Sequence, residues 1–154
     1  MGRRAIVNVL VGLLVVGCGS ESTVPTAPSG LGGTADLRGT WVQVNGDTRT
    51  WVLDQGGIQA GGPASFSQSA YPSVGAVSGT GGVSGAVVFG AFRFAETYES
   101  LNIPSRPSPN NCYVDTDGQL VVSGNTMRGS VTETLGCAGV RVGQVTRDLV
   151  MQRR

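Results

Sequence analysis

The chain has 154 residues and a formal net charge of +1 at pH 7, with 11 basic and 10 acidic residues. It contains no histidine, which removes the usual general base, the commonest metal ligand and the Ser/His/Asp and Cys/His arrangements of nucleophilic catalysis. Glycine is abundant (25 residues) and aromatic residues are few (6%), a composition that suits short strands and tight turns better than helices. The near-neutral charge provides no basic patch, so we expect no nucleic-acid partner.

The first residues have the three parts of a secretory signal peptide. Arg3 and Arg4 form a basic head, residues 5–16 are almost wholly apolar, and the small residue Gly17 follows. The apolar run is too short for a membrane-spanning helix, which needs about 20 residues. We therefore predict that residues 1–17 are a signal peptide, which is removed on export and takes no part in the fold.

Residues 15–18, Val-Val-Gly-Cys, resemble the lipobox of bacterial lipoproteins. The resemblance implies that Cys18 carries diacylglycerol, that the signal is cut before it, and that several acyl chains such as palmitate anchor the protein lastingly in a membrane of the cell envelope. In enteric-type sorting an Asp after the cysteine favours the inner membrane, so Gly19 implies the outer membrane. The alternative is an ordinary signal peptide with an incidental cysteine.

Residues 18–35 are rich in Ser, Thr, Gly and Pro and show no hydrophobic periodicity. This composition predicts that the lipidated cysteine is followed by a disordered tether, which spans roughly 20 Å at about 5–6 Å × √n. Residues 36–154 are then long enough for one domain with a core of its own, and too short for two.

Alternating polar and apolar residues predict a meander of short strands from residue 39 onward. The first turn is expected at Asn45-Gly46-Asp47, a strong hairpin signal, and another at the glycine-rich segment 79–82. The strands of this half are expected at 39–44, 48–54, 58–67, 74–78 and 83–97.

The second half begins with a long irregular segment at 98–111, which contains three prolines. Loops of this length often carry binding sites. Turns are expected at Asp117-Gly118 and Gly124-Asn125, and a loop at 135–143. Strands are expected at 112–115, 119–123, 126–134 and 145–152. Eight or nine strands in consecutive hairpins leave exposed edges unless the sheet closes, so the predicted fold class is all-β, a small antiparallel up-and-down meander barrel of about eight strands.

Two cysteines remain besides Cys18. In an oxidising, exported compartment Cys112 and Cys137 are expected to form a disulfide. It would close a loop of about 25 residues and stabilise the fold by roughly 3 kcal/mol on the chain-entropy model. The alternative is a redox-active pair, but the two residues lack the Cys-x-x-Cys spacing of such pairs.

Gly39-Thr40-Trp41 at the start of a meander resembles the calycin group, which includes lipocalins and avidins. The lipocalin resemblance implies a barrel that holds a small apolar ligand, with the tryptophan packed across the closed end against an arginine of the last strand, for which Arg147 is the candidate. An avidin-type biotin site needs an Asn where this chain has Gln43, and further tryptophans after Trp51, which are absent from the sequence. Biotin binding is therefore not expected.

Trp41, Trp51 and Phe92 are the candidate ligand-binding residues, because aromatic walls suit apolar ligands. The alternative is that they are core, since a barrel of eight strands is either filled by side chains or holds one small ligand.

Other polar residues give no catalytic or metal site. Asp115, Asp117 and Gly118 resemble a fragment of a calcium loop, but a hairpin turn explains them as well. Glu96 and Glu99 are expected on opposite strand faces. No catalytic residue, metal or cofactor is assigned, and an enzyme is not expected.

Two functions are compatible with this sequence. The first is a membrane-anchored envelope lipoprotein whose small barrel binds an apolar small molecule. The second is a non-catalytic structural or interaction lipoprotein, in which the loop from Ser100 to Asn111 and exposed strands contact another envelope protein.

Overall fold

The structure, a computed structural model, describes residues 35–106 and 111–154. The predicted signal peptide, Cys18 and the tether up to residue 34 lie outside these ranges, as do residues 107–110 of the predicted long loop. The described residues form strands joined by turns and contain no helix that could span a membrane.

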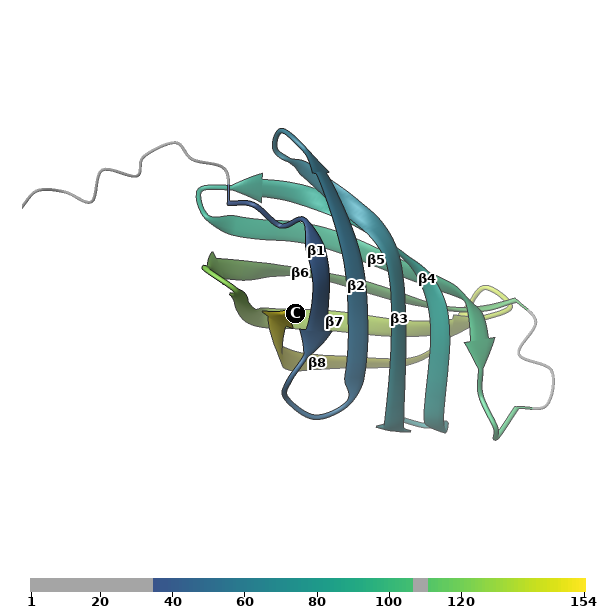
Figure 1. Cartoon of the computed structure of the whole chain (residues 1–154). Helices are drawn as coiled ribbons and strands as arrows, with labels where there is room; N and C mark the ends of the chain where they lie inside the picture. The colour runs from purple at the N-terminus through teal and green to yellow at the C-terminus, as the bar shows by residue number, and fades with distance from the viewer. Residues whose placement is uncertain (1–34, 107–110) are drawn as a thin grey trace, which may run out of the picture. The chain divides into compact units, whose positions relative to one another are not determined.

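Eight antiparallel strands form one closed barrel in which each strand pairs with its neighbours in sequence and β1 pairs with β8 (Figure 1). The strands are β1 (Gly39–Gln43), β2 (Thr48–Gly56), β3 (Gln59–Tyr71), β4 (Gly75–Val88), β5 (Ala91–Asn102), β6 (Cys112–Ser123), β7 (Thr126–Cys137) and β8 (Val140–Arg153). Closure removes the unpaired edges that an open meander of this length would expose. The predicted fold class is confirmed.

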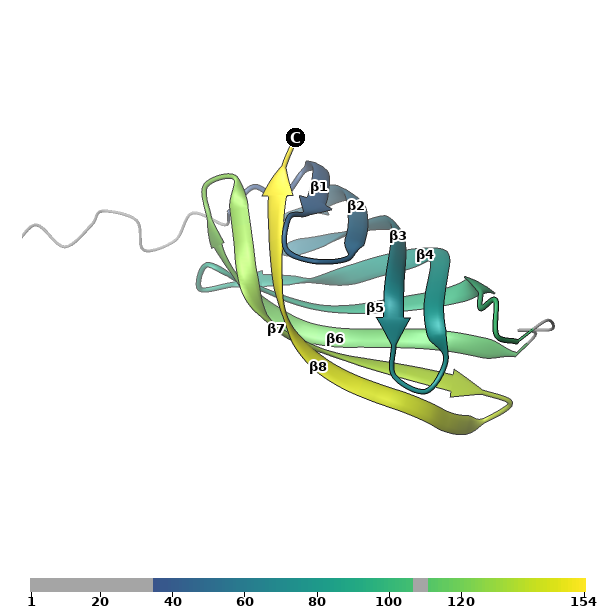
Figure 2. The same cartoon turned by 90° about the horizontal axis from the view of Figure 1, so that it is seen from below.

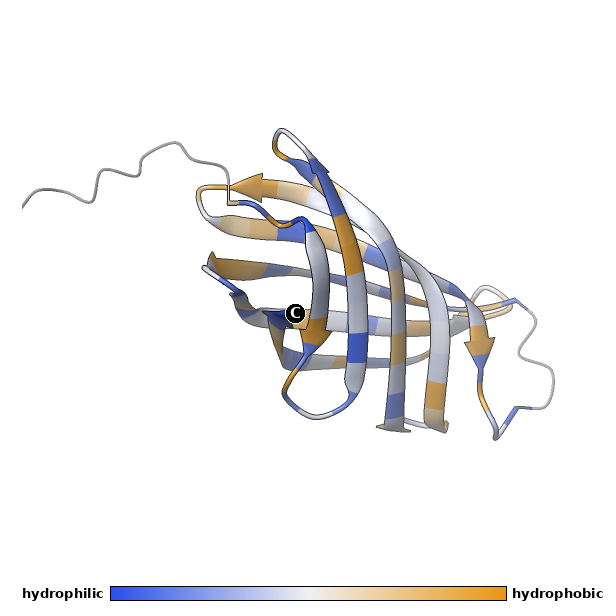
Figure 3. Cartoon of the chain, in the orientation of Figure 1, coloured by the Kyte–Doolittle hydropathy of each residue, from blue (hydrophilic) through white to orange (hydrophobic). Residues whose placement is uncertain are grey.

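The alternation of side chains along each strand builds the core. In β5, Phe92, Phe94, Glu96 and Tyr98 are buried, whereas the residues between them are exposed. Successive side chains of a strand point to opposite faces, so this period of two separates the barrel interior from its outer surface. The same alternation appears along the strands as changing hydropathy in Figure 3.

The glycine-rich segment 79–82 was predicted to be a turn, and this prediction is wrong. β4 runs through it with only a register shift between Thr80 and Gly81. The hairpin turn lies instead at Phe89-Gly90, where φ is 49° and 76°, so that the predicted strand 83–97 is split between β4 and β5. Two residues with positive φ match the type I′ turn that joins twisted strands most readily.

Gly81 is glycine because the backbone of β5 passes very close to it. A Cβ there would overlap the carbonyl oxygen of Thr97 and lie 2.8 Å from the Cα of Tyr98. Glycine inside a strand commonly marks such a close approach or a bulge. The same residue type therefore serves turns at some positions and strand packing at others, and sequence alone does not separate the two.

Gly81→Ala should lower the free energy of unfolding by roughly 3 kcal/mol, the upper end of the range for over-packing, because backbone rather than a flexible side chain must move. Gly82→Ala is the matched control, since its Cβ would meet only the carbonyl oxygen of Gly62 at 3.8 Å. Urea unfolding of both variants measures the difference. Equal stabilities would contradict the close approach of β4 and β5.

Two further turn predictions in the second half are wrong. Asp117-Gly118 lies within the continuous strand β6, where Gly118 pairs with Val131 and a Cβ would be 2.9 Å from the carbonyl oxygen of Ser130. The predicted loop 135–143 consists of the end of β7, a turn at Ala138-Gly139 and the start of β8. Neither the calcium-loop nor the hairpin-turn interpretation of Asp115 and Asp117 holds, because both are exposed strand residues.

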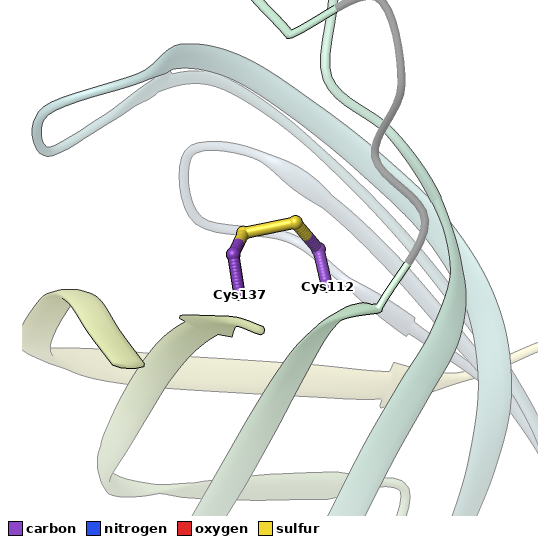
Figure 4. Close-up of a disulfide and its surroundings, with 2 residues drawn as sticks. All are labelled: Cys112 and Cys137. Atoms are coloured by element: carbon purple, nitrogen blue, oxygen red, sulfur yellow. A yellow bond between two sulfur atoms is a disulfide. The ribbon is translucent and has the colours of Figure 1, made fainter. Parts of the chain in front are cut away.

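The predicted disulfide is confirmed. Cys112 begins β6 and Cys137 ends β7, and the two residues are direct partners in the strand register (Figure 4). The bond joins β6 to β7 at the end of the barrel opposite the one where β1 begins.

Candidate functional site: the barrel interior

The three candidate ligand-binding residues lie in the barrel interior and are fully buried. Trp41 and Trp51 are direct partners across β1 and β2. The ring of Trp51 meets Phe92 edge-on at 6.1 Å and Phe94 at 4.9 Å between centroids. Such edge-to-face geometry is favourable between aromatic rings. The structure thus brings Trp51 together with Phe92, and each of the three side chains is covered by protein.

Trp41 helps to close the end of the barrel at which β1 begins. Its Nε1 donates a hydrogen bond to the carbonyl oxygen of Leu37 at 2.7 Å, and the guanidinium of Arg153 lies 4.8 Å from its ring centroid. A guanidinium over an indole face is a favourable cation–π contact. Leu37 is itself fully buried, so the segment before β1 packs over this end.

Arg147 was the expected partner of Trp41, and this assignment is wrong. The register between β1 and β8 pairs Trp41 with Arg153, six positions further along the last strand. Arg147 instead binds Asp47 at 2.8 Å and Glu133 at 3.1 Å. Several arginines are spaced along β8, and only the strand register decides which of them lies beside the tryptophan.

A cluster of charged and polar side chains occupies the interior beyond the aromatic residues. Arg49 Nη2 donates to Glu133 Oε1 at 2.6 Å, and Arg49 Nε lies 3.4 Å from Glu96 Oε2. Gln68 Nε2 donates to Glu133 Oε2 at 2.7 Å. The side chains of Arg49, Glu96 and Glu133 are at most 1% exposed, so these charged groups contact one another instead of water.

These contacts cross the lumen. Arg49 lies on β2, Gln68 on β3 and Glu133 on β7, and neither β2 nor β3 is a neighbour of β7 in the sheet. Tyr71 adds a bond from its hydroxyl to the backbone oxygen of Glu133 at 3.1 Å, and Arg147 donates to Gln68 Oε1 at 3.0 Å. At this level the barrel is bridged by side chains from opposite walls.

Burial and mutual contact shift the acid–base properties of this cluster. Burial raises the pKa of Glu96, although Arg49 and the hydrogen bonds from Tyr98 and Trp51 act in the opposite direction. Burial alone would lower the pKa of Arg49, but Glu96, Tyr98 and Glu133 raise it above its ordinary value. Burial and the carboxylate of Glu133 raise the pKa of Tyr71 to about 12. Arg49 is therefore a permanent cation and Tyr71 a neutral hydrogen-bond donor at neutral pH.

At the opposite end of the barrel, the turn between β3 and β4 lies close to β8 (Figure 2). A Cβ on Gly143 of β8 would lie 3.1 Å from the backbone oxygen of Pro72 and 3.2 Å from the ring of Tyr71. Ser105 Oγ donates to the backbone oxygen of Val74 at 2.7 Å, which holds the start of the β5–β6 loop beside the same turn. Ile103 of that loop is buried.

The interior cluster was not predicted from the sequence. The alternation of β2 places Arg49 on the face of Trp51, which signals a buried charge, but no short-range pattern points to Gln68 or Glu133 as its partners. Glu96 and Glu99 do lie on opposite faces, Glu96 inside and Glu99 exposed, as predicted. Glu96 therefore belongs to the buried charge cluster, whereas Glu99 lies on the outer surface and the two carboxylates do not form a pair.

A shallow, open groove of about 660 Å³ lies on the outer surface over β4 and β5, and polar residues that include Thr80, Ser84, Thr97 and Glu99 line it. Among the described residues no three Cys, Asp or Glu side chains are grouped so that they could hold a metal ion. Comparison of the chain with protein-family models, with curated proteins and with solved structures finds no match.

Proposed function

We propose that this chain is an envelope lipoprotein, anchored through Cys18 in the outer membrane, whose barrel is a non-catalytic structural or interaction module rather than a carrier of an apolar small molecule. The lipobox-like residues 15–18 and the tether composition of residues 18–35 support the anchor. The calycin resemblance implies a barrel that holds a small apolar ligand, but the interior of this barrel argues for a filled core.

The observation that carries the proposal is the bridged lumen. Arg49, Gln68 and Tyr71 reach across to Glu133 with hydrogen bonds of 2.6–3.1 Å, and Trp41, Trp51 and Phe92 are fully buried beside them. A ligand at this level would have to separate paired, buried charges, each of which is costly to leave without a partner. Partners are then expected at the outer surface and the turns.

The anchor is tested by the intact mass of the chain purified from bacterial membranes. We expect a mature form that begins at Cys18 and carries the mass of diacylglycerol and a further acyl chain, while Cys18→Ser yields an uncleaved or lipid-free product. A mature wild-type chain without lipid mass would contradict the anchor.

The choice between the two functions is tested by native mass spectrometry of the full mature chain in mild detergent. We expect the mass of the polypeptide with its lipid, or of a complex with a protein partner captured by crosslinking in membranes. A reproducible extra mass of a few hundred daltons that is released on denaturation would instead establish the small-molecule carrier.

A further inference from the structure

The end of the barrel where β1 begins exposes apolar side chains at successive turns. In an up-and-down barrel this end holds the β2–β3, β4–β5 and β6–β7 turns together with the end of β8. Ile58 in the β2–β3 turn is 52% exposed, and Phe89 in the β4–β5 turn is fully exposed. Val88 and Val121 beside them are also exposed. Figure 3 shows hydrophobic colouring near the tips of the β2–β3 and β4–β5 hairpins.

Backbone hydrogen bonds join these turns into one rim. Val87 N donates to Ile58 O and Val122 N donates to Gly90 O, each at 2.8 Å. Phe89, between these two bonds, is therefore flanked by Ile58 on one side and by the Val121 segment on the other. The exposed apolar residues therefore lie on turns that are joined to one another, whereas single exposed apolar residues scattered over a surface are common and need no explanation.

The stability of the fold does not explain why a phenylalanine occupies position 89 of this turn. Its φ of 49° lies in the left-handed region, which Asn, Asp and Gly adopt far more readily than a bulky residue. Type I′ turns favour Asn-Gly and Asp-Gly for this reason. A phenylalanine there opposes both the backbone preference and the solubility of the hairpin, so a contact outside the barrel is the reason that remains.

Two observations indicate what this rim contacts. The described chain enters the barrel at this end, at Ala35, and about 17 residues separate it from Cys18, a distance of at most about 60 Å when fully extended. The strands also carry exposed arginines just behind the turns, namely Arg93 in β5 and Arg128 in β7, whereas Arg38 before β1 is paired with Asp36 at 2.9 Å. Apolar tips backed by cations match the interface of an anionic bilayer.

We propose that this rim rests on the membrane that holds the lipid anchor, with Ile58 and Phe89 inserted at the level of the lipid headgroups and with Arg93 and Arg128 facing lipid phosphates. The inference rests on the proposed anchor at Cys18, which it extends by fixing the orientation of the barrel. The opposite end, with the disulfide and the β3–β4 turn, then faces away from the bilayer.

The test places a fluorescent residue at either end of the full, lipidated chain in vesicles of phosphatidylethanolamine and phosphatidylglycerol. Phe89→Trp reports on the rim, and Val140→Trp, at an exposed position (66%) beside the β7–β8 turn, is the matched control at the other end. Trp41 and Trp51 are fully buried and contribute the same background to both variants. Brominated lipids should quench the emission of Phe89→Trp at least twofold more strongly than that of Val140→Trp.

Equal quenching of the two variants would overturn the orientation while the chain remains attached to the vesicles. Loss of the chain from the vesicles, or a mass without lipid, would instead overturn the anchor, so the two failures are distinguishable. A double variant, Ile58→Asp with Phe89→Asp, keeps a residue suited to the type I′ turn and should abolish crosslinking of the rim to photoreactive phosphatidylglycerol. Crosslinking of the wild-type rim to one envelope protein instead of lipid would also overturn the proposal.

Discussion

Arg49→Met is expected to lower the free energy of unfolding by roughly 3–5 kcal/mol at neutral pH, as found when one partner of a buried ion pair is removed. Arg49 is the cation between Glu96 and Glu133, and all three side chains are at most 1% exposed. Methionine fills a similar volume without charge. Glu133 keeps its contact with Arg147 at 3.1 Å, but in the described structure Glu96 has no other cation beside it.

The loss should depend on pH, with a sign that follows from Glu96. Burial already raises the pKa of this carboxyl in the folded protein, and removal of Arg49 takes away a contact that lowers it. An acid whose folded pKa exceeds its unfolded value of about 4.3 favours folding only while it is protonated. The contribution is therefore complete below about pH 4 and is lost as pH rises through the folded pKa.

Urea unfolding of wild type and Arg49→Met at about pH 4.5 and pH 7.5 measures this effect, and the difference between the two proteins should be larger at the higher pH. Arg49→Met combined with Glu96→Gln should flatten the dependence, because the amide does not titrate, and its oxygen can still accept from Trp51 and Tyr98. Arg141→Met is the control: its side chain is exposed and, among the described residues, bonds only Gln144, so a change within about 0.5 kcal/mol is expected. An Arg49→Met loss that is equal at both pH values would show that packing, not charge, is responsible.

Trp51→Ala is expected to lower the free energy of unfolding by about 3–5 kcal/mol, the usual cost of truncating a buried tryptophan. The substitution removes the edge contacts with Phe92 and Phe94 and leaves Glu96 without the indole N–H. Trp51→Phe should cost less, since it retains an aromatic ring and loses mainly the hydrogen bond to a charged acceptor.

The two Trp51 variants distinguish a core role of this residue from a role in ligand binding. If Trp51 is core, its truncation is destabilising whether or not any small molecule is present. If Trp51 lines a ligand cavity, Trp51→Ala should leave the stability of the ligand-free chain within about 1 kcal/mol, and that result would contradict the filled interior. Val52→Ala, at the next position and exposed on the outer face, is the control and should change stability little.

Much of the barrel follows from local patterns. The alternation of β1 and β2, the turn at Asn45-Gly46-Asp47 and the turn at Gly124-Asn125 are visible in sequence because each depends on neighbouring residues alone. The two wrongly predicted glycine turns share one cause. Gly81 and Gly118 are glycines demanded by a neighbouring strand, and a strand that lies far away in sequence leaves no local signal to distinguish such a glycine from a turn.

The interior shows the same division. Trp41, Trp51 and Phe92 could be assigned to the inside from their hydrophobicity and their spacing, but whether they line a cavity depends on what reaches them from the far wall. That was decided by Glu133, which lies 84 residues from Arg49 and binds it across the lumen.

The sequence by itself determined the all-β class, the number of strands within one, and the pairing of Cys112 with Cys137, and its prediction of export and attachment at Cys18 stays a prediction. These depend on composition, short motifs and local periodicity. Only the tertiary structure decided which last-strand arginine covers Trp41, how the buried charges pair, and that Phe89 projects from a hairpin tip. Register and closure set those contacts, and both are properties of strands brought together from distant parts of the chain.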